Sequence, residues 1–195
     1  MSKVHIYPIT RYPRQAELRG GGVVQLRPMT PEDGDALLAF FRRIPEEDRF
    51  FLKDDVTSPT VIRAWAENLD YDRALPLLAT VNGRIVGDAA LIRHRGGPRR
   101  HLAEIRVVID PDYRGRGLGV AMMRELVEIA YDAGLEMVVF ELVPEAQDDA
   151  IKAAQFLGAF EAGRVTDLVK DMHGRPHDVV FLVLPLGKWW EWSQF

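Results

Sequence analysis

The strongest constraint on the fold is a glycine-rich turn, RGRGLG at residues 114–119, which stands between a strand-like segment and a helix-like one. The segment before it, residues 101–110, is mostly apolar and has the length of a strand. After it, apolar residues recur at the i, i+3 and i+4 spacing of one helix face. They are Val120, Met123, Leu126, Val127, Ala130 and Tyr131. A strand that leads through such a turn into an amphipathic helix predicts a sheet with helices packed on it.

The same turn is suited to binding an anion. Its glycines, at positions 115, 117 and 119, remove side chains so that backbone N–H groups can approach a ligand closely. The helix that begins there presents unpaired N–H groups and the positive end of its dipole. Phosphate is the anion usually bound at such a helix end. Arg114 and Arg116 add positive charge, so the residues predict a phosphate site at the start of the helix.

Two nucleotide-binding motifs do not match this turn. A P-loop requires Gly-Lys-Ser/Thr after the glycines, whereas Gly119 is followed here by Val120 and Ala121. A dinucleotide-binding fingerprint has the form G-x-G-x-x-G, and counting from Gly115 the third glycine of this chain comes one position early. On the residues alone, a phosphate-binding turn and a turn that only connects strand to helix remain open alternatives.

The pattern of the other segments predicts further strands and helices around this unit. The dipeptide Asn82-Gly83 predicts a two-residue hairpin turn, and strand–helix–strand units pair in parallel. We therefore expect an α/β (α+β) fold with a mixed, mostly antiparallel sheet of about six to seven strands flanked by helices. Strands are expected at 23–27, 75–81, 84–93, 101–110, 137–143, 159–165, 166–172 and 178–186, and helices at 30–44, 58–69, 118–133 and 147–157.

The chain is expected to form one domain with an N-terminal arm. Residues 1–22 are polar and end in three glycines, which predicts a flexible arm in which residues 4–7 form an edge strand. No linker or repeat interrupts residues 23–195, which are predicted to be the single domain. The segment 188–192 contains three tryptophans. It predicts packing on the core, a homodimer contact or part of an acceptor pocket.

Composition and charge exclude several kinds of chemistry. The chain has 195 residues and no cysteine, which excludes a disulfide framework, a thiolate metal site and a cysteine nucleophile. The five histidines show no metal-ligand spacing, so no metal is expected. The net charge of −4 disfavours nonspecific binding of nucleic acid. No apolar run approaches the roughly 18 residues of a membrane span, and the N-terminus lacks an apolar signal core. We therefore expect a cytoplasmic protein without nucleic-acid or membrane partners.

The glycine turn and its surroundings resemble the Gcn5-related N-acetyltransferase (GNAT) family. The family signature is Arg/Gln-x-x-Gly-x-Gly/Ala, which residues 114–119 match in full. Residues 105–113 are similar to the family's fourth strand and its connection, and the element order from residue 23 to residue 186 is the family's order. The resemblance implies acetyl-coenzyme A (acetyl-CoA) as the donor. It also implies a GNAT-like domain whose fourth and fifth strands splay apart to admit that donor.

The resemblance further implies which residues hold the donor. The pyrophosphate of CoA would lie on the N–H groups of residues 114–120, and the pantetheine arm would pair with the backbone of residues 107–109. Gln147 stands where the family has an asparagine at a helix start, and its amide can still hydrogen-bond CoA. The expected CoA-binding residues are Val107, Val108, Ile109, Arg114, Gly115, Arg116, Gly117, Leu118, Gly119, Val120 and Gln147.

Glu104 is the candidate general base. Alternation on a strand puts Glu104, Arg106 and Val108 on one face, and a carboxylate is not what an apolar strand prefers. The context Ala103-Glu104-Ile105 also resembles that of the catalytic glutamate in the histone-acetylating branch of the family. The alternative is a structural ion pair with Arg106 or across strands.

The general acid departs from the family pattern. Many members carry a tyrosine four residues before a helix-ending glycine, and this chain has Ala154 four residues before Gly158. Tyr131 or a water could replace that tyrosine, although Tyr131 also fits a packing role on its helix. Otherwise the thiolate leaves without a proton. Without a cysteine for an acyl-enzyme, direct attack by the amine is expected.

The resemblance therefore predicts an N-acetyltransferase that moves an acetyl group from acetyl-CoA to a primary amine. The acceptor is a protein lysine, a protein N-terminus or a small-molecule amine. The missing tyrosine and the ambiguous role of Glu104 leave an alternative from another class, a non-catalytic CoA-binding sensor or scaffold of the same fold.

Overall fold

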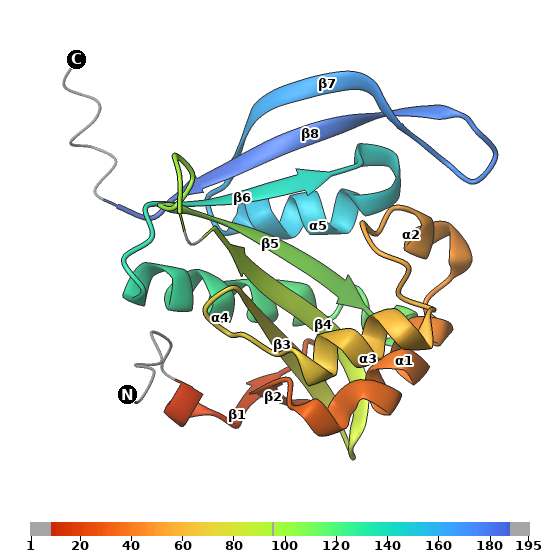
Figure 1. The fold of residues 1–195 in the computed structure, drawn as a ribbon, viewed down its shortest axis with the longest axis vertical. Coiled ribbons are helices and arrows are strands. Elements are labelled where there is room, and N and C mark those ends of the chain that lie inside the picture. Colours follow the sequence, from red (N-terminus) through yellow and green to blue (C-terminus); the bar gives the residue numbers. More distant parts are fainter. Residues whose placement is uncertain (1–8, 95, 188–195) are drawn as a thin grey trace.

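The computed structural model describes residues 9–94 and 96–187. Its central element is one sheet of eight strands in the order β1-β2-β3-β4-β5-β6-β8-β7 (Figure 1). The pairs are antiparallel except β5 with β6, which is parallel, so the sheet is mixed and mostly antiparallel as predicted. The strands are β1 Arg14–Glu17, β2 Val23–Pro28, β3 Ala74–Val81, β4 Arg84–Arg93, β5 Leu102–Ile109, β6 Met137–Leu142, β7 Phe160–Lys170 and β8 Pro176–Pro185.

The sheet has more strands than the six to seven that the sequence predicted. One strand that was not expected at its position is β1, which lies within the expected N-terminal arm and pairs antiparallel with β2. The sequence did not predict this strand because the arm is short and polar and shows no alternation of apolar residues. The strand forms because the free edge of β2 can pair with it through backbone hydrogen bonds. The two strands expected at 159–165 and 166–172 form a single strand, β7, whose register with β8 shifts between Val165 and Val169. The edge strand expected at residues 4–7 and the tryptophan-rich segment 188–192 lie outside the described residues.

Helices cover both faces of the sheet and bury a separate apolar cluster on each. Figure 1 shows α4 and α5 on one face, and α1 and α3 on the other. The larger cluster contains α4 residues such as Met122 and Leu126, and the smaller one contains Phe40 and Phe41 of α1. Among the described residues, no helix has the length and apolarity that a membrane crossing needs. The helices are α1 Gly34–Arg43, α2 Glu46–Phe50, α3 Pro59–Glu67, α4 Leu118–Asp132 and α5 Pro144–Phe156.

The turns follow the local chemistry of their residues. Val81 pairs with Arg84, so Asn82 and Gly83 form the whole β3–β4 turn, both at positive φ (50° and 79°). Such a turn matches the twist of the strands that it joins, as the Asn-Gly dipeptide predicted. Gly134 follows α4 at a φ of 73° and provides the left-handed residue that ends many helices.

Strands β5 and β6 splay apart at one end of the sheet. They pair only from Leu102 with Met137 to Glu104 with Val139, although β5 continues to Ile109 and β6 to Leu142. Figure 1 shows the two strands diverging beyond this point. These are the strands expected to splay, at residues 101–110 and 137–143. We call the point where they separate, at the Glu104–Val139 pair, the fork.

At Gly87, α4 packs closely on the sheet. A Cβ at this position would lie 2.8 Å from the Sδ of Met122, 3.2 Å from the Cδ1 of Ile109 and 3.3 Å from the Cβ of Ala79. Met122 is fully buried, so its side chain has little room to withdraw. The backbone of β4 therefore requires glycine here because the helix and two strands already fill the space.

Gly87→Ala is expected to lower the free energy of unfolding by about 1–3 kcal/mol, the usual cost of overpacking a core. Gly163→Ala is the matched control, because Gly163 is also a strand glycine but has nothing within 4 Å of an added Cβ. Urea denaturation of both variants measures the difference. A Gly87→Ala protein as stable as Gly163→Ala would show that the contact between β4 and α4 is looser than described.

Candidate functional site

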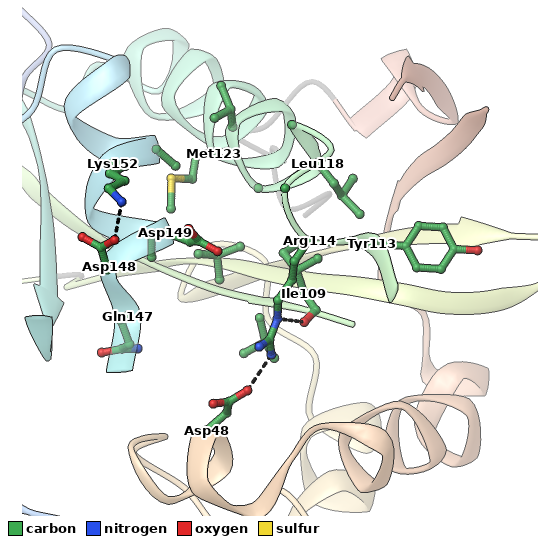
Figure 2. Close-up of a pocket in the computed structure, with 18 of the residues that line it drawn as sticks. Asp48, Ile109, Tyr113, Arg114, Leu118, Met123, Gln147, Asp148, Asp149 and Lys152 are labelled. Atoms are coloured by element: carbon green, nitrogen blue, oxygen red, sulfur yellow. Dashed lines mark hydrogen bonds and ion pairs between the residues drawn. The ribbon is translucent and has the colours of Figure 1, made fainter. Parts of the chain in front are cut away.

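A cleft of about 540 Å³ opens where β5 separates from β6. Its walls are the second half of β5, the glycine turn, the start of α4 and the start of α5, as Figure 2 shows for part of the lining. Of the expected CoA-binding residues, all line the cleft except Arg116. Those present are Val107, Val108, Ile109, Arg114, Gly115, Gly117, Leu118, Gly119, Val120 and Gln147. The fold thus brings together residues that are up to 40 positions apart in the chain.

The glycine turn leaves backbone donors free at the start of α4. Gly115 and Gly117 have φ values of 68° and 83°, and Gly117 is the N-cap of α4. The first hydrogen bond of the helix runs from the N–H of Ala121 to the carbonyl of Gly117. The N–H groups of residues 118–120 therefore have no partner within the helix and point to its N-terminal end. An added Cβ on Gly115 would meet nothing within 4 Å, so this part of the turn is open to a ligand.

The two arginines of the turn do not direct free charge into the cleft, contrary to the expectation from the sequence. The Arg114 Nε donates to the carbonyl of Ile109 at 3.1 Å, and its Nη2 is 2.7 Å from the carboxylate of Asp48 in α2. The Arg116 Nη2 donates to the carbonyl of Gly21 at 2.6 Å, and its guanidinium lies over the Tyr113 ring. Both guanidiniums therefore hold neighbouring segments against the turn.

Arg19, which the sequence did not suggest, lines the cleft from the turn between β1 and β2. This turn is fixed to the glycine turn by the N–H of Arg19, which donates to the carbonyl of Arg116 at 2.9 Å. The adjacent Leu18 is buried in the main core. The sequence did contain one signal that this part of the arm packs on the domain, an apolar leucine directly before Arg19 and three glycines.

The start of α5 forms the wall of the cleft opposite the glycine turn (Figure 2). Gln147 has non-helical backbone angles, and its Oε1 accepts a hydrogen bond from the N–H of Val143 at 2.8 Å. The regular part of the helix thus begins near the predicted residue 147, and the side-chain NH₂ group of Gln147 stays available as a donor. Asp148 forms an ion pair with Lys152, while Asp149 also lines the cleft.

Glu104 lies at the fork in a network of charges. Its Oε1 accepts from the Nε of Arg106 at 2.8 Å and from the Nζ of Lys53 at 3.0 Å. Lys53 also donates to Glu141 of β6 at 2.6 Å, so one ammonium bridges the two diverging strands. Burial raises the pKa of the Glu104 carboxyl, but the hydrogen bonds from Arg106 and Lys53 outweigh burial, and the net pKa is lowered. Glu104 is thus ionised at neutral pH, and the ion pair with Arg106 that the sequence left open is present.

A second carboxylate near the cleft was not suggested by the sequence. Asp88 of β4 is paired with Val108, one of the lining residues, and lies on the same face of the sheet. Its Oδ1 is buried and has no hydrogen-bond partner among the described residues, and burial raises the pKa of this carboxyl to about 7. Asp88 is therefore a group that changes protonation near neutral pH next to the cleft.

Neither Ala154 nor Tyr131, the two positions considered for the general acid, places a hydroxyl in the cleft. Ala154, at the place of the family's tyrosine, is fully buried, and Phe156 lines the cleft without a hydroxyl. Tyr131 is 64% exposed and lies outside the residues that line the cleft, so the packing role considered for it is wrong. Tyr113 is the phenol found among the described lining residues, and Figure 2 shows its ring directed away from α5.

Comparison with known proteins assigns the chain to a family. The model of the acetyltransferase (GNAT) family matches residues 38–159, which is more than half of the chain. The chain belongs to the GNAT family. This family uses acetyl-CoA, and the observations above fit that group: unpaired N–H groups at α4, open space at Gly115, and a stretch of β5 that has no partner on the side of β6.

Similar proteins include both curated relatives and solved structures of GNAT members. A probable glucosamine 6-phosphate N-acetyltransferase from Oryza sativa is 39% identical over 72 residues, which cover 34% of this chain and 42% of the relative. A glucosamine 6-phosphate N-acetyltransferase from Trypanosoma brucei brucei is 44% identical over 64 residues, covering 30% and 42%. The chain thus spans less than half of the length of these relatives.

The solved structures establish the fold. A GNAT acetyltransferase from Streptococcus pneumoniae has a TM-score of 0.74 and 22% identity, covering 84% of this chain and 99% of that one. The Salmonella typhimurium protein yncA, described with its cofactor acetyl-CoA, has a TM-score of 0.72 and 20% identity, covering 85% and 95%. At such identities the likeness concerns the GNAT fold alone.

Proposed function

We propose that this GNAT protein is an N-acetyltransferase that moves the acetyl group of acetyl-CoA to a primary amine by direct attack. The observation that carries the proposal is the geometry of the fork. The cleft with free N–H donors lies along the separated part of β5, and the ionised carboxylate of Glu104, which does not itself line the cleft, lies at the last pair of β5 with β6. Donor and acceptor can approach such a fork from opposite faces of the sheet.

The chain's own groups would hold acetyl-CoA along the cleft. The N–H groups at residues 115–120 bind the pyrophosphate, because they lie at the positive end of α4. The N–H of Arg114, which the sequence also suggested, already donates to the carbonyl of Pro111 at 3.3 Å. The backbone of residues 107–109 has no partner on β6 and pairs with the amides of the pantetheine arm. The NH₂ group of Gln147 donates from the opposite wall. When bound, acetyl-CoA supplies the activated acetyl group as a thioester.

Glu104 would accept the proton that the amine must lose. A free primary amine is protonated at neutral pH and attacks only after deprotonation. The lowered pKa keeps Glu104 ionised and ready to hold the ammonium, and the amine attacks the thioester carbon as a proton passes to the carboxylate. The new C–N bond replaces the C–S bond, and the thiolate leaves without a protein acid at the Ala154 position.

The acceptor is a primary amine: a protein lysine, a protein N-terminus or a small molecule. The carboxylates of Glu104 and Glu141 already hold one primary ammonium, that of Lys53, at 3.0 and 2.6 Å. This supports an amine acceptor without selecting its carrier. Because two relatives are named as glucosamine 6-phosphate N-acetyltransferases, that amino sugar is the first small molecule to test.

A second function, a CoA-binding sensor or scaffold without catalysis, is favoured by two observations. Glu104 is bound by two cations, and Ala154 replaces the family's tyrosine. In that case the same cleft binds acetyl-CoA but no acceptor is modified. The homodimer, the absence of a metal and the cytoplasmic location predicted from the sequence stay predictions.

Calorimetry combined with a thiol-release assay separates the two functions. We expect acetyl-CoA to bind and free thiol to appear in the presence of an acceptor from a panel of amino sugars, polyamines and lysine or N-terminal peptides. Binding without thiol release over the whole panel would overturn the enzyme and leave the sensor. The absence of any binding to acetyl-CoA would overturn both.

A further inference from the structure

The N-terminal arm places one arginine, Arg19, at the glycine turn. The N–H of Arg19 donates to the carbonyl of Arg116 at 2.9 Å, and Leu18 is buried in the main core. On the other side, the Arg116 guanidinium donates to the carbonyl of Gly21 at 2.6 Å. The turn between β1 and β2 is thus held to the glycine turn by contacts on both sides of Arg19, so its backbone position is fixed.

The side chain of Arg19 lies across the N-terminal end of α4. Its Nε, Cγ and Cδ are 3.6, 3.7 and 3.8 Å from the point that a Cβ on Gly117 would occupy. Gly117 is the N-cap of α4, and the free N–H groups of the first helical turn follow it. The guanidinium of Arg19 therefore lies beside these donors and lines the cleft.

Of the three arginines at the turn, Arg19 has its guanidinium free for a ligand. Arg114 is bound by the carbonyl of Ile109 and by Asp48, and Arg116 by the carbonyl of Gly21. Within the part of the chain that the structure describes, the Arg19 guanidinium has neither a hydrogen bond nor an ion pair. It is also exposed, so a ligand can reach it.

We propose that Arg19 binds the pyrophosphate of CoA together with the N–H groups of the glycine turn. The inference rests on the proposed function, because it takes CoA as the ligand. A pyrophosphate carries negative charge that the partial charge of one helix end does not neutralise, and Asp149 and Glu145 add further negative charge to the lining. A guanidinium is the side chain best matched to phosphate oxygens, which it binds through two parallel N–H donors. The arm is thus part of the coenzyme site.

Isothermal titration calorimetry on the full chain tests this assignment. Arg19→Ala is expected to weaken the binding of CoA about 10- to 100-fold, the effect of losing charge-assisted hydrogen bonds. Because 3′-dephospho-CoA keeps the pyrophosphate, its binding should fall by the same factor. Arg19→Lys should lose less than Arg19→Ala, since it keeps the charge. The matched control is Arg124→Ala, an exposed arginine of α4 outside the cleft, which should bind CoA like the parent.

Each outcome decides one question. An equal loss with both ligands supports Arg19 as a pyrophosphate ligand. A loss with CoA alone would place Arg19 at the 3′-phosphate, and a loss below twofold would remove it from the site, so either result overturns the inference. If the parent protein itself fails to bind CoA, the proposed function fails first. As a control for folding, the Arg19→Ala protein should have the same melting temperature as the parent.

Discussion

Replacing Gly117 with alanine is expected to weaken CoA binding by about 100-fold, the value of one to two charge-assisted hydrogen bonds. Gly117 is the N-cap of α4 at a φ of 83°, a conformation that costs other residues about 1–2 kcal/mol. Alanine there would either strain the turn or rotate it, and a rotated turn no longer aims the N–H groups of residues 118–120 at one point. Calorimetry with CoA measures the loss of affinity.

The same helix provides the matched control for this strain. Gly134 lies just past the other end of α4 at a φ of 73°, and an added Cβ would meet nothing within 4 Å. Gly134→Ala therefore carries a similar backbone cost, about 1–2 kcal/mol of unfolding free energy, far from the cleft. We expect both variants to unfold more easily and only Gly117→Ala to lose CoA. Equal affinities in the two variants would show that the glycine turn does not hold the coenzyme.

The elements that the sequence predicted well are those encoded by neighbouring residues. The Asn82-Gly83 turn, the glycine after α4 and the start of α4 at the glycine turn all depend on residues within a few positions of one another. The splay of β5 and β6 came from the family resemblance instead, since no local pattern reports how far two distant strands stay paired. Apart from Arg116, the expected CoA-binding residues gather in one cleft, because they belong to the glycine turn, to the separated part of β5 and to the start of α5.

The features that the sequence missed depend on contacts between distant segments. Arg19 meets Arg116 across 97 positions of the chain, and no periodicity in a polar arm announces that meeting. Lys53 meets Glu104 and Glu141 across 51 and 88 positions. The sequence assigned the charges of Arg114 and Arg116 to the ligand, because two of their partners, Asp48 and the carbonyl of Gly21, are 66 and 95 positions away in the chain. Such side-chain partners depend on how distant segments pack in the folded protein, and they cannot be predicted from composition or from the spacing of residues.

Glu104→Gln is expected to lower the rate of acetyl transfer about 100-fold, the lower range for removal of a general base, and to leave CoA affinity unchanged. The change keeps the size of the side chain and removes its charge. Because the pKa of Glu104 is lowered, the parent keeps this base ionised across the neutral range. The ratio of parent to variant rates should therefore stay flat near neutral pH and shrink only in acid, where Glu104 takes up a proton. Thiol release measured against pH gives this ratio.

Two control variants separate catalysis from the ion pairs at the fork. Glu141→Gln removes the other carboxylate that binds Lys53, and Asp88→Asn removes the buried carboxyl whose pKa is about 7. We expect each to transfer acetyl within a few-fold of the parent. A loss in Glu141→Gln equal to that in Glu104→Gln would mean that the fork only needs negative charge. A large loss confined to Asp88→Asn would transfer the role of base to Asp88.

Stability against pH gives an independent measure of the structural role of Glu104. A carboxyl whose pKa is lowered by folding stabilises the native state above its unfolded-state pKa, and this contribution is lost as the pH falls through the folded-state pKa. The Glu104→Gln protein should therefore melt below the parent at pH 7, and the difference should decrease toward pH 3. Glu141→Gln, which breaks the same ammonium bridge, is also expected to melt below the parent at pH 7. If Glu104→Gln and Glu141→Gln melt alike at pH 7 but only Glu104→Gln transfers acetyl slowly, proton transfer is assigned to Glu104. The loss of the ion pair with Lys53, which both variants share, cannot account for such a difference in rate.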